Sequence, residues 1–84
     1  MTRLLVAGAG LIGSRHAAHI AEHPDLTLAG VIDPSKDLRS AFQAPGFDDI
    51  SQVDVPADGI VIATPTQFHA PVFEAAAARG WHAL

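Results

Sequence analysis

The chain lacks cysteine, has few aromatic residues and carries no run of basic residues. Without cysteine it can form neither a disulfide scaffold nor a cysteine-based metal site. Its formal net charge of −4 and its 6% of aromatic residues offer no cationic, base-stacking surface. The composition therefore excludes a disulfide-rich class of protein, and we expect no nucleic-acid partner.

A long hydrophobic run is also missing from the N-terminal region. The apolar segment 4–13 follows Arg3 and contains three glycines, which disfavour a helix. A membrane-spanning helix needs about 20 consecutive apolar residues. We therefore expect no signal peptide, no membrane partner and a cytoplasmic location.

Hydrophobic residues nevertheless make up 49% of the 84 residues, which is typical of one small globular unit. Short apolar runs at 4–7, 26–32 and 59–63 predict strands buried on both faces. Residues 81–84 predict the start of a further strand. The segment 44–56 contains prolines and aspartates and predicts loops with, at most, a short edge strand.

Three helices are expected between these strands. Apolar residues at helical spacing predict the first over 11–23, where the following proline disfavours further helix. Ser35 is the expected N-cap of a short second helix that ends at about residue 42. The third is expected over 67–79, capped by Thr66 and ended by Gly80.

The order of these elements is β-α-β-α-loop-β-α-β. Such alternation is typical of an α/β protein whose parallel sheet is covered by helices on both faces. We therefore predict a sheet of about four to five strands with three helices.

The sequence G-A-G-L-I-G at 8–13 lies between the first strand and the first helix. In this context Gly8 allows a tight turn, Gly10 lets the backbone approach a pyrophosphate, and Gly13 lets the helix pack close to the strand. The amide groups and positive dipole end of the helix then face the phosphates. The motif predicts a Rossmann-type dinucleotide-binding fold. The contacts expected from this segment are Gly8, Gly10, Leu11, Ile12 and Gly13.

An acidic residue completes the pattern. Asp33 lies 20 residues after Gly13, at the end of the second strand, where a carboxylate accepts hydrogen bonds from the adenosine ribose. It would repel a 2′-phosphate, which favours NAD as the cofactor. Ser35, Lys36 and Arg39 lie just downstream and could accommodate that phosphate, so NADP stays open. Ser35 is included among the expected cofactor contacts.

The segment A-T-P-T-Q-F-H at 63–69 follows a buried strand and precedes an alanine-rich helix. This arrangement resembles the glucose-fructose oxidoreductase/inositol dehydrogenase (Gfo/Idh/MocA) family. Further similarities are His16 after the glycine loop, V-I-D at 31–33, Asp58 before I-V-I-A-T-P at 60–65, and A-R-G-W-H-A-L at 78–84. Together they cover essentially the whole chain.

The resemblance implies a two-domain NAD(P)-dependent oxidoreductase. Such enzymes transfer a hydride between the nicotinamide and a sugar, a cyclitol or a similar alcohol or carbonyl substrate. The family's Thr-Pro turn lies beside the cofactor, although Thr66 stands where the family often has asparagine. The second group of expected cofactor contacts is therefore Ala63, Thr64, Pro65, Thr66 and His69. We also expect a homo-oligomer.

One feature of the family is missing. Its last strand here is normally followed by Glu-Lys-Pro, whose lysine positions substrate, whereas this sequence ends at Leu84. We therefore expect residues 1–84 to be the N-terminal part of the dinucleotide-binding domain, without the substrate domain. No catalytic residue is assigned, and the chain alone is expected to be inactive.

The histidines allow other interpretations. His16, His19 and His23 share a helix face, which would suit a metal site, but no acidic or sulfur ligand accompanies them. A solvated histidine face is the simpler interpretation, and we assign no metal. His69 has the intrinsic pKa range of an acid–base catalyst, but the resemblance gives it a structural or cofactor-side role.

Two other functions are compatible with the glycine loop. A non-catalytic module could bind NAD(H) and regulate a partner. A methyltransferase using S-adenosylmethionine also places a glycine loop and an acid at these positions, but it has no reason to contain the A-T-P segment at 63–65.

Overall fold

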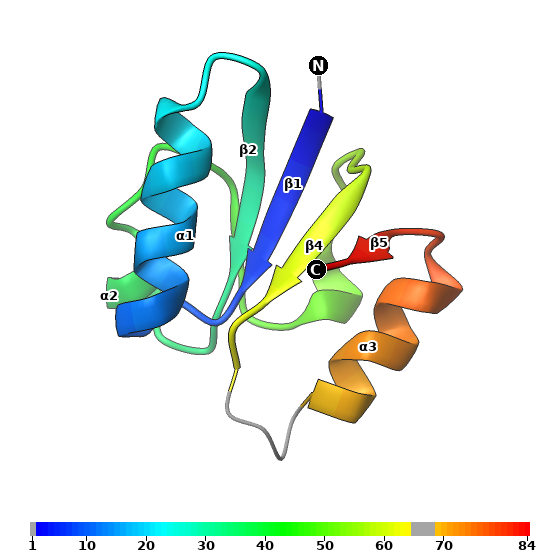
Figure 1. Ribbon diagram of the computed structural model, residues 1–84. Helices are drawn as coiled ribbons and strands as arrows, with labels where there is room; N and C mark the ends of the chain where they lie inside the picture. Colours follow the sequence, from blue (N-terminus) through cyan, green and yellow to red (C-terminus); the bar gives the residue numbers. More distant parts are fainter. Residues whose placement is uncertain (1, 65–68) are drawn as a thin grey trace.

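The computed structural model of the chain describes residues 2–64 and 69–84. These residues form five strands in one parallel sheet with the order β3-β2-β1-β4-β5 (Figure 1). The strands are β1 (Thr2–Ala7), β2 (Leu26–Ile32), β3 (Gly46–Phe47), β4 (Gly59–Ile62) and β5 (His82–Ala83). The helices are α1 (Leu11–Glu22), α2 (Lys36–Arg39) and α3 (His69–Ala78), with a 3₁₀ turn, η1 (Ile50–Gln52). The predicted Rossmann-type α/β fold is confirmed.

Strand β1 forms the centre of the sheet because it pairs with β2 on one side and β4 on the other. It begins at Thr2, two residues before the predicted start at Leu4. Thr2 and Arg3 are exposed and polar, so hydropathy marks only the buried part of the strand. The predicted edge strand in the segment 44–56 is confirmed as β3.

Alternating side chains of β1 supply the two faces of the sheet. Leu4 and Val6 pack on α1, where Ala17 and Ile20 complete a small buried cluster. Burying a side chain such as Val6 stabilises the fold by about 1.5–3 kcal/mol relative to leaving it exposed.

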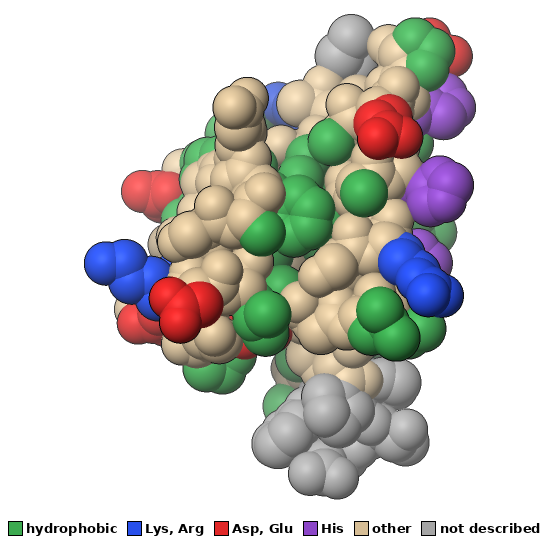
Figure 2. Space-filling model, turned by 90° about the vertical axis from the view of Figure 1, so that its left-hand side faces the viewer, with side chains coloured by type: hydrophobic (Ala, Val, Ile, Leu, Met, Phe, Trp, Pro, Cys, Tyr) green, Lys and Arg blue, Asp and Glu red, His purple; other side chains and the backbone are tan. Residues whose placement is uncertain are grey.

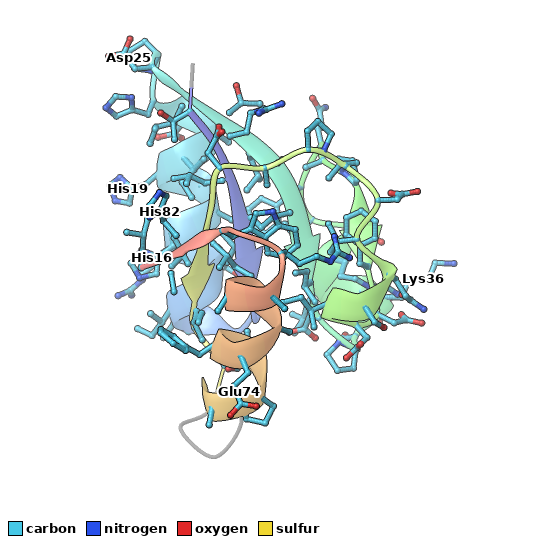
Figure 3. All side chains as sticks on the ribbon, turned by 90° about the vertical axis from the view of Figure 1, so that its right-hand side faces the viewer. His16, His19, Asp25, Lys36, Glu74 and His82 are labelled. Carbon is cyan, nitrogen blue, oxygen red and sulfur yellow. The ribbon has the colours of Figure 1, made fainter. Side chains whose placement is uncertain are left out.

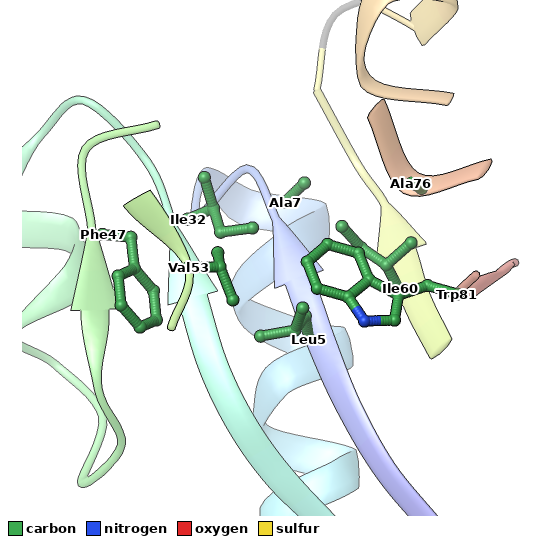
Figure 4. Close-up of a cluster of buried hydrophobic side chains, with 8 residues drawn as sticks. All are labelled: Leu5, Ala7, Ile32, Phe47, Val53, Ile60, Ala76 and Trp81. Atoms are coloured by element: carbon green, nitrogen blue, oxygen red, sulfur yellow. The ribbon is translucent and has the colours of Figure 1, made fainter. Parts of the chain in front are cut away.

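The opposite face carries the larger cluster, which α3 and η1 cover (Figures 1 and 4). Leu5 and Ile60 are completely buried at its centre. Its other members are Ala7, Ile32, Phe47, Val53, Ala76 and Trp81. The sheet is therefore covered on both faces, as predicted.

The ends of the long helices follow the predicted signals. His23, the residue before Pro24, has extended backbone and ends α1. Gly80 has a φ of +76° and ends α3, where the amides of Gly80 and Trp81 donate to the carbonyls of Ala77 and Ala76. This Schellman arrangement favours glycine. The expected Thr66 cap lies outside the described residues.

Helix α2 is shorter than predicted. The Ser35 hydroxyl accepts a hydrogen bond from the Leu38 amide at 3.4 Å, which confirms the N-cap. The helix ends at Arg39 rather than near Phe42, because the amides of Ala41 and Phe42 bond to carbonyls three residues back. The chain thus tightens into turns and leaves the α-helical pattern.

Arg79 links α3 to the η1 segment. Its Nη2 donates to the Val53 carbonyl at 2.8 Å, and its guanidinium lies 4.9 Å from the centre of the Trp81 ring. This cation–π contact covers the indole that closes the larger cluster. Trp81 itself is buried.

An ion pair between Arg3 and Asp58 gives one pH-dependent prediction. Side-chain and then backbone hydrogen bonds from Arg3 hold the pKa of Asp58 below 3.8. Because the folded-state pKa is the lower one, the pair stabilises the fold above about pH 3.8, and this is lost as pH falls through the folded pKa. Arg3→Met should raise the pKa of Asp58 part of the way back, since the backbone bond remains. Carboxyl-carbon NMR titration measures this, and an unchanged midpoint would contradict it.

Candidate functional site

The glycine loop lies at the carboxyl ends of β1 and β4 (Figure 1). Gly8 has a φ of +95°, a conformation that other residues rarely adopt. Its amide donates to the Ile32 carbonyl at 2.7 Å, and the Ala63 amide donates to the Ala7 carbonyl at 2.8 Å. These bonds fix the loop against the ends of β2 and β4.

Gly13 and Gly10 meet very different surroundings. A Cβ atom on Gly13 would lie 1.7 Å from the Gly8 carbonyl oxygen, so only glycine fits there. A Cβ atom on Gly10 would meet nothing within 4 Å. Gly13 therefore serves helix–strand packing, while the space in front of Gly10 stays open for a ligand that approaches the backbone. Gly10 is also the N-cap of α1 and offers no side chain to its first amides.

Asp33 is fixed by two backbone amides. Its Oδ2 accepts from Ala9 at 2.7 Å, and its Oδ1 accepts from Ser35 at 2.8 Å. A carboxylate has about four lone-pair directions, so each oxygen retains capacity for a ligand hydroxyl. Asp33 thus joins the glycine loop to the end of β2 and still presents acceptors.

A cleft of about 700 Å³ opens in front of these groups. It lies where neighbouring strands β1 and β4 lead to helices on opposite faces, the usual ligand site of an open parallel sheet. Its walls are mainly apolar, with a few acidic side chains. The lining residues are Ala7, Gly8, Gly10, Leu11, Ile12, Ile32, Asp33, Pro34, Leu38, Asp48, Asp49, Ile50, Ala63, Thr64, Pro71 and Val72.

The predicted contacts separate into three groups. Those that line the cleft are Gly8, Gly10, Leu11, Ile12, Asp33, Ala63 and Thr64. Gly13 lies behind the loop, and Ser35 adjoins the cleft but uses its hydroxyl to cap α2. Pro65 and Thr66 lie outside the described residues, as does the side chain of His69, whose backbone begins α3.

Leu11 and Ile12, both among the expected cofactor contacts, line the cleft. Their exposed fractions are 70% and 56%. They lie in the first turn of α1, which extends past the sheet and forms a wall of the cleft. Their apolar character serves the cleft rather than the core.

Sequence analysis missed the side of the cleft formed after β3. Asp48, Asp49 and Ile50 line the cleft there, and Leu38 of α2 also belongs to the lining. The two-residue strand β3 is too short to give a periodic signal, so nothing marked the residues that follow it.

The cleft carries negative charge from Asp33, Asp48 and Asp49. Hydrogen bonds from the hydroxyl and then the amide of Ser51 hold the pKa of Asp49 below its usual value, so this side chain is ionised at neutral pH. Asp48 forms an ion pair with Arg39, with 2.9 Å between Oδ1 and Nη2. Lys36 projects from the molecule into solvent and does not line the cleft (Figure 3).

The histidines of α1 lie apart from this cleft. His16, His19 and His23 are exposed, and Figure 2 shows histidine side chains in a row on the surface. His16 and His19 point away from the sheet (Figure 3). Among residues 2–64 and 69–84, no group of three or more histidine, cysteine, aspartate or glutamate side chains could hold a metal ion. Within the same residues, no helix has the length and apolarity to cross a membrane.

Comparison with known proteins agrees with this geometry. Residues 2–84 match the family model for the Gfo/Idh/MocA oxidoreductases, described as an oxidoreductase family with an NAD-binding Rossmann fold. The chain belongs to this family. A comparison with curated proteins gave no match.

Solved structures of Gfo/Idh/MocA-like dehydrogenases share this fold. A myo-inositol dehydrogenase from Corynebacterium glutamicum is 36% identical, with a TM-score of 0.81 over 99% of this chain and 27% of its own. The WlbA dehydrogenase from Bordetella pertussis, solved with NADH and UDP-GlcNAcA, is 28% identical, with a TM-score of 0.84 over 96% of this chain and 27% of its own. The present chain thus spans about a quarter of the length of these relatives.

Proposed function

We propose that this chain supplies the dinucleotide-binding part of an NAD-dependent oxidoreductase. The enzyme would act on a sugar, a cyclitol or a related alcohol, with residues 1–84 as the N-terminal portion of the cofactor domain. The proposal rests on the contrast between two glycines. Gly13 has no room for a side chain, whereas Gly10 faces open space in the cleft.

The residues around the loop suit a dinucleotide. The first turn of α1 would direct its amides and its positive dipole end toward the pyrophosphate. Gly10 would allow the phosphates to approach the backbone, and Leu11 and Ile12 would shield them from solvent. When bound, the nicotinamide would accept or donate the hydride, and the chain's own residues would orient the dinucleotide for that transfer.

The end of β2 supports NAD as the preferred cofactor. Asp33 keeps acceptor capacity on both oxygens for the ribose hydroxyls, and its charge would repel a 2′-phosphate. Of the three residues that left NADP open, Ser35 caps α2 and Arg39 is paired with Asp48. Lys36 projects into solvent.

Titration of the chain with NAD and with NADP, followed by backbone-amide NMR, tests the proposal. We expect saturable shifts at Gly8, Gly10, Asp33 and Thr64, with tighter binding of NAD. Binding should also stabilise the fold, by about 2.7 kcal/mol at 100 times Kd. A well-dispersed spectrum that does not respond to NAD would contradict the proposal, as would a preference for S-adenosylmethionine over either dinucleotide.

The 84-residue chain should bind NAD without catalysing oxidation of myo-inositol. The proposal leaves substrate binding and proton transfer to residues outside 1–84, so no NADH should form above the enzyme-free rate. Absorbance at the NADH band measures this. Turnover by the chain alone would show that its own residues complete the active site and would contradict this division.

A further inference from the structure

Two aspartates lie side by side at one edge of the sheet. Asp33 follows β2 and Asp48 follows β3, and these neighbouring strands pair through Ile32 and Phe47. The Asp33 amide donates to the Phe47 carbonyl at 2.9 Å, which continues the pairing beyond the strands. Both aspartates line the cleft, so the ribose end of a dinucleotide at Asp33 would lie beside Asp48.

Arg39 is paired with one of these two carboxylates, that of Asp48. Its Nη2 lies 2.9 Å from the Asp48 Oδ1, and 16% of its side chain is exposed, against 60% for Asp48. The aliphatic stem of Arg39 packs over Gly46, where an added Cβ would lie 3.2 Å from the Arg39 Cβ. Among the described residues the buried Nε has no hydrogen-bond partner. The guanidinium is thus held by Asp48, which lines the cleft, whereas Arg39 itself is not among the lining residues.

We propose that Asp48 determines cofactor specificity by holding Arg39 away from the 2′-phosphate of NADP. The inference rests on the proposed dinucleotide-binding function. The Asp48 carboxylate neutralises the guanidinium charge, so Arg39 offers no net positive charge beside Asp33. A guanidinium released from this pair would bind phosphate well, because its planar donors match phosphate oxygens. Asp33 would bind the ribose and repel the phosphate by its own charge, and the Asp48–Arg39 pair would add to that rejection by withholding a cation.

Asp48→Asn tests this inference through Kd values for NAD and NADP at fixed ionic strength. Removing the charge weakens the contact that holds Arg39 and leaves the guanidinium charge uncompensated, so the ratio of the NADP Kd to the NAD Kd should fall about tenfold. The Kd for NAD should change less than about twofold, since Asp33 is untouched. An unchanged ratio in a folded variant would overturn the inference. Asp48→Ser serves the same test if the asparagine variant does not fold.

Asp49→Asn is the matched control. It removes one charge from the same cleft but leaves the Asp48–Arg39 pair intact, and its side-chain oxygen can still accept from Ser51. The ratio should fall by no more than about threefold, through weaker long-range repulsion alone. A fall as large as that of Asp48→Asn would show that charge in the cleft matters and that Arg39 does not.

The double variant Asp48→Asn with Arg39→Met decides the role of Arg39. Methionine retains an aliphatic stem over Gly46 and leaves no buried Nε, so the fold should persist, as the amide spectrum can verify. The gain in NADP affinity should disappear, and its persistence would overturn the inference. If the folded wild-type chain binds neither dinucleotide, the proposed function itself fails. If it binds NAD and the ratio does not respond to Asp48, only the specificity inference fails.

Discussion

Replacing Gly13 by alanine is expected to remove a large share of the chain's stability. The added Cβ would lie 1.7 Å from the Gly8 carbonyl oxygen and 2.7 Å from its carbon. Both atoms belong to backbone that Gly8 holds at a φ of +95°, so neither can rotate away as a side chain would. Relief requires α1 to move off the sheet, which would cost more than about 3 kcal/mol. A domain of this size has only about 4–13 kcal/mol in total.

Urea unfolding followed by the fluorescence of Trp81 measures this loss. Trp81 is the single tryptophan of the chain and is buried under Arg79, so its emission reports the larger cluster. Gly10→Ala is the matched control because its Cβ meets no atom within 4 Å. It should cost no more than about 1 kcal/mol, the usual penalty of alanine at an N-cap. Equal stability losses in the two variants would refute the distinction between these glycines.

The same Gly10→Ala variant should lose most of its affinity for NAD while remaining folded. Its Cβ would occupy the space through which a pyrophosphate approaches the first amides of α1. We expect Kd to rise about 100-fold, equivalent to about 2.7 kcal/mol. Isothermal titration calorimetry measures the affinity, and thermal melting with NAD should show that stabilisation by the ligand has disappeared.

Glu22→Ala provides the comparison for this binding experiment. Glu22 is exposed in the last turn of the same helix, and it is not among the residues that line the cleft. The substitution removes a charge and leaves the glycine loop unchanged, so the Kd for NAD should stay within about twofold of the wild-type value. Undiminished binding by Gly10→Ala would mean that the dinucleotide does not pass over this backbone.

The proposed specificity of the site depends on charge, and the two cofactor experiments address different groups. Gly10 governs access to phosphates that NAD and NADP share, so its substitution should weaken both. Asp48 would govern only the 2′-phosphate, so its substitution should change their ratio. The variants could lower the affinity for both NAD and NADP and leave the ratio of the two Kd values unchanged. That result would support the dinucleotide site and contradict the inferred role of Asp48 in cofactor specificity.

The fold and the glycine-loop half of the candidate site could be predicted from the sequence alone. Apolar runs of strand length, alternating with helical spacing, require a parallel sheet with crossover helices, because each face must be buried. The glycine spacing and the position of Asp33 are local signals, since each residue acts within a few positions of a strand end. Pro24 and Gly80 likewise predict where α1 and α3 end.

The surroundings of Asp33 could not be predicted from the sequence, because they depend on how the strands pair. Asp48 and Asp49 come from a segment without periodicity, and they reach the cleft because β3 pairs with β2. The ion pair of Asp48 with Arg39 joins residues on two elements, so no local pattern could reveal it. The exposure of Leu11 and Ile12 likewise depends on where the sheet ends beneath α1. Local chemistry thus predicts the loop that is proposed to bind the phosphates, whereas strand pairing brings together the charges that would distinguish one dinucleotide from another.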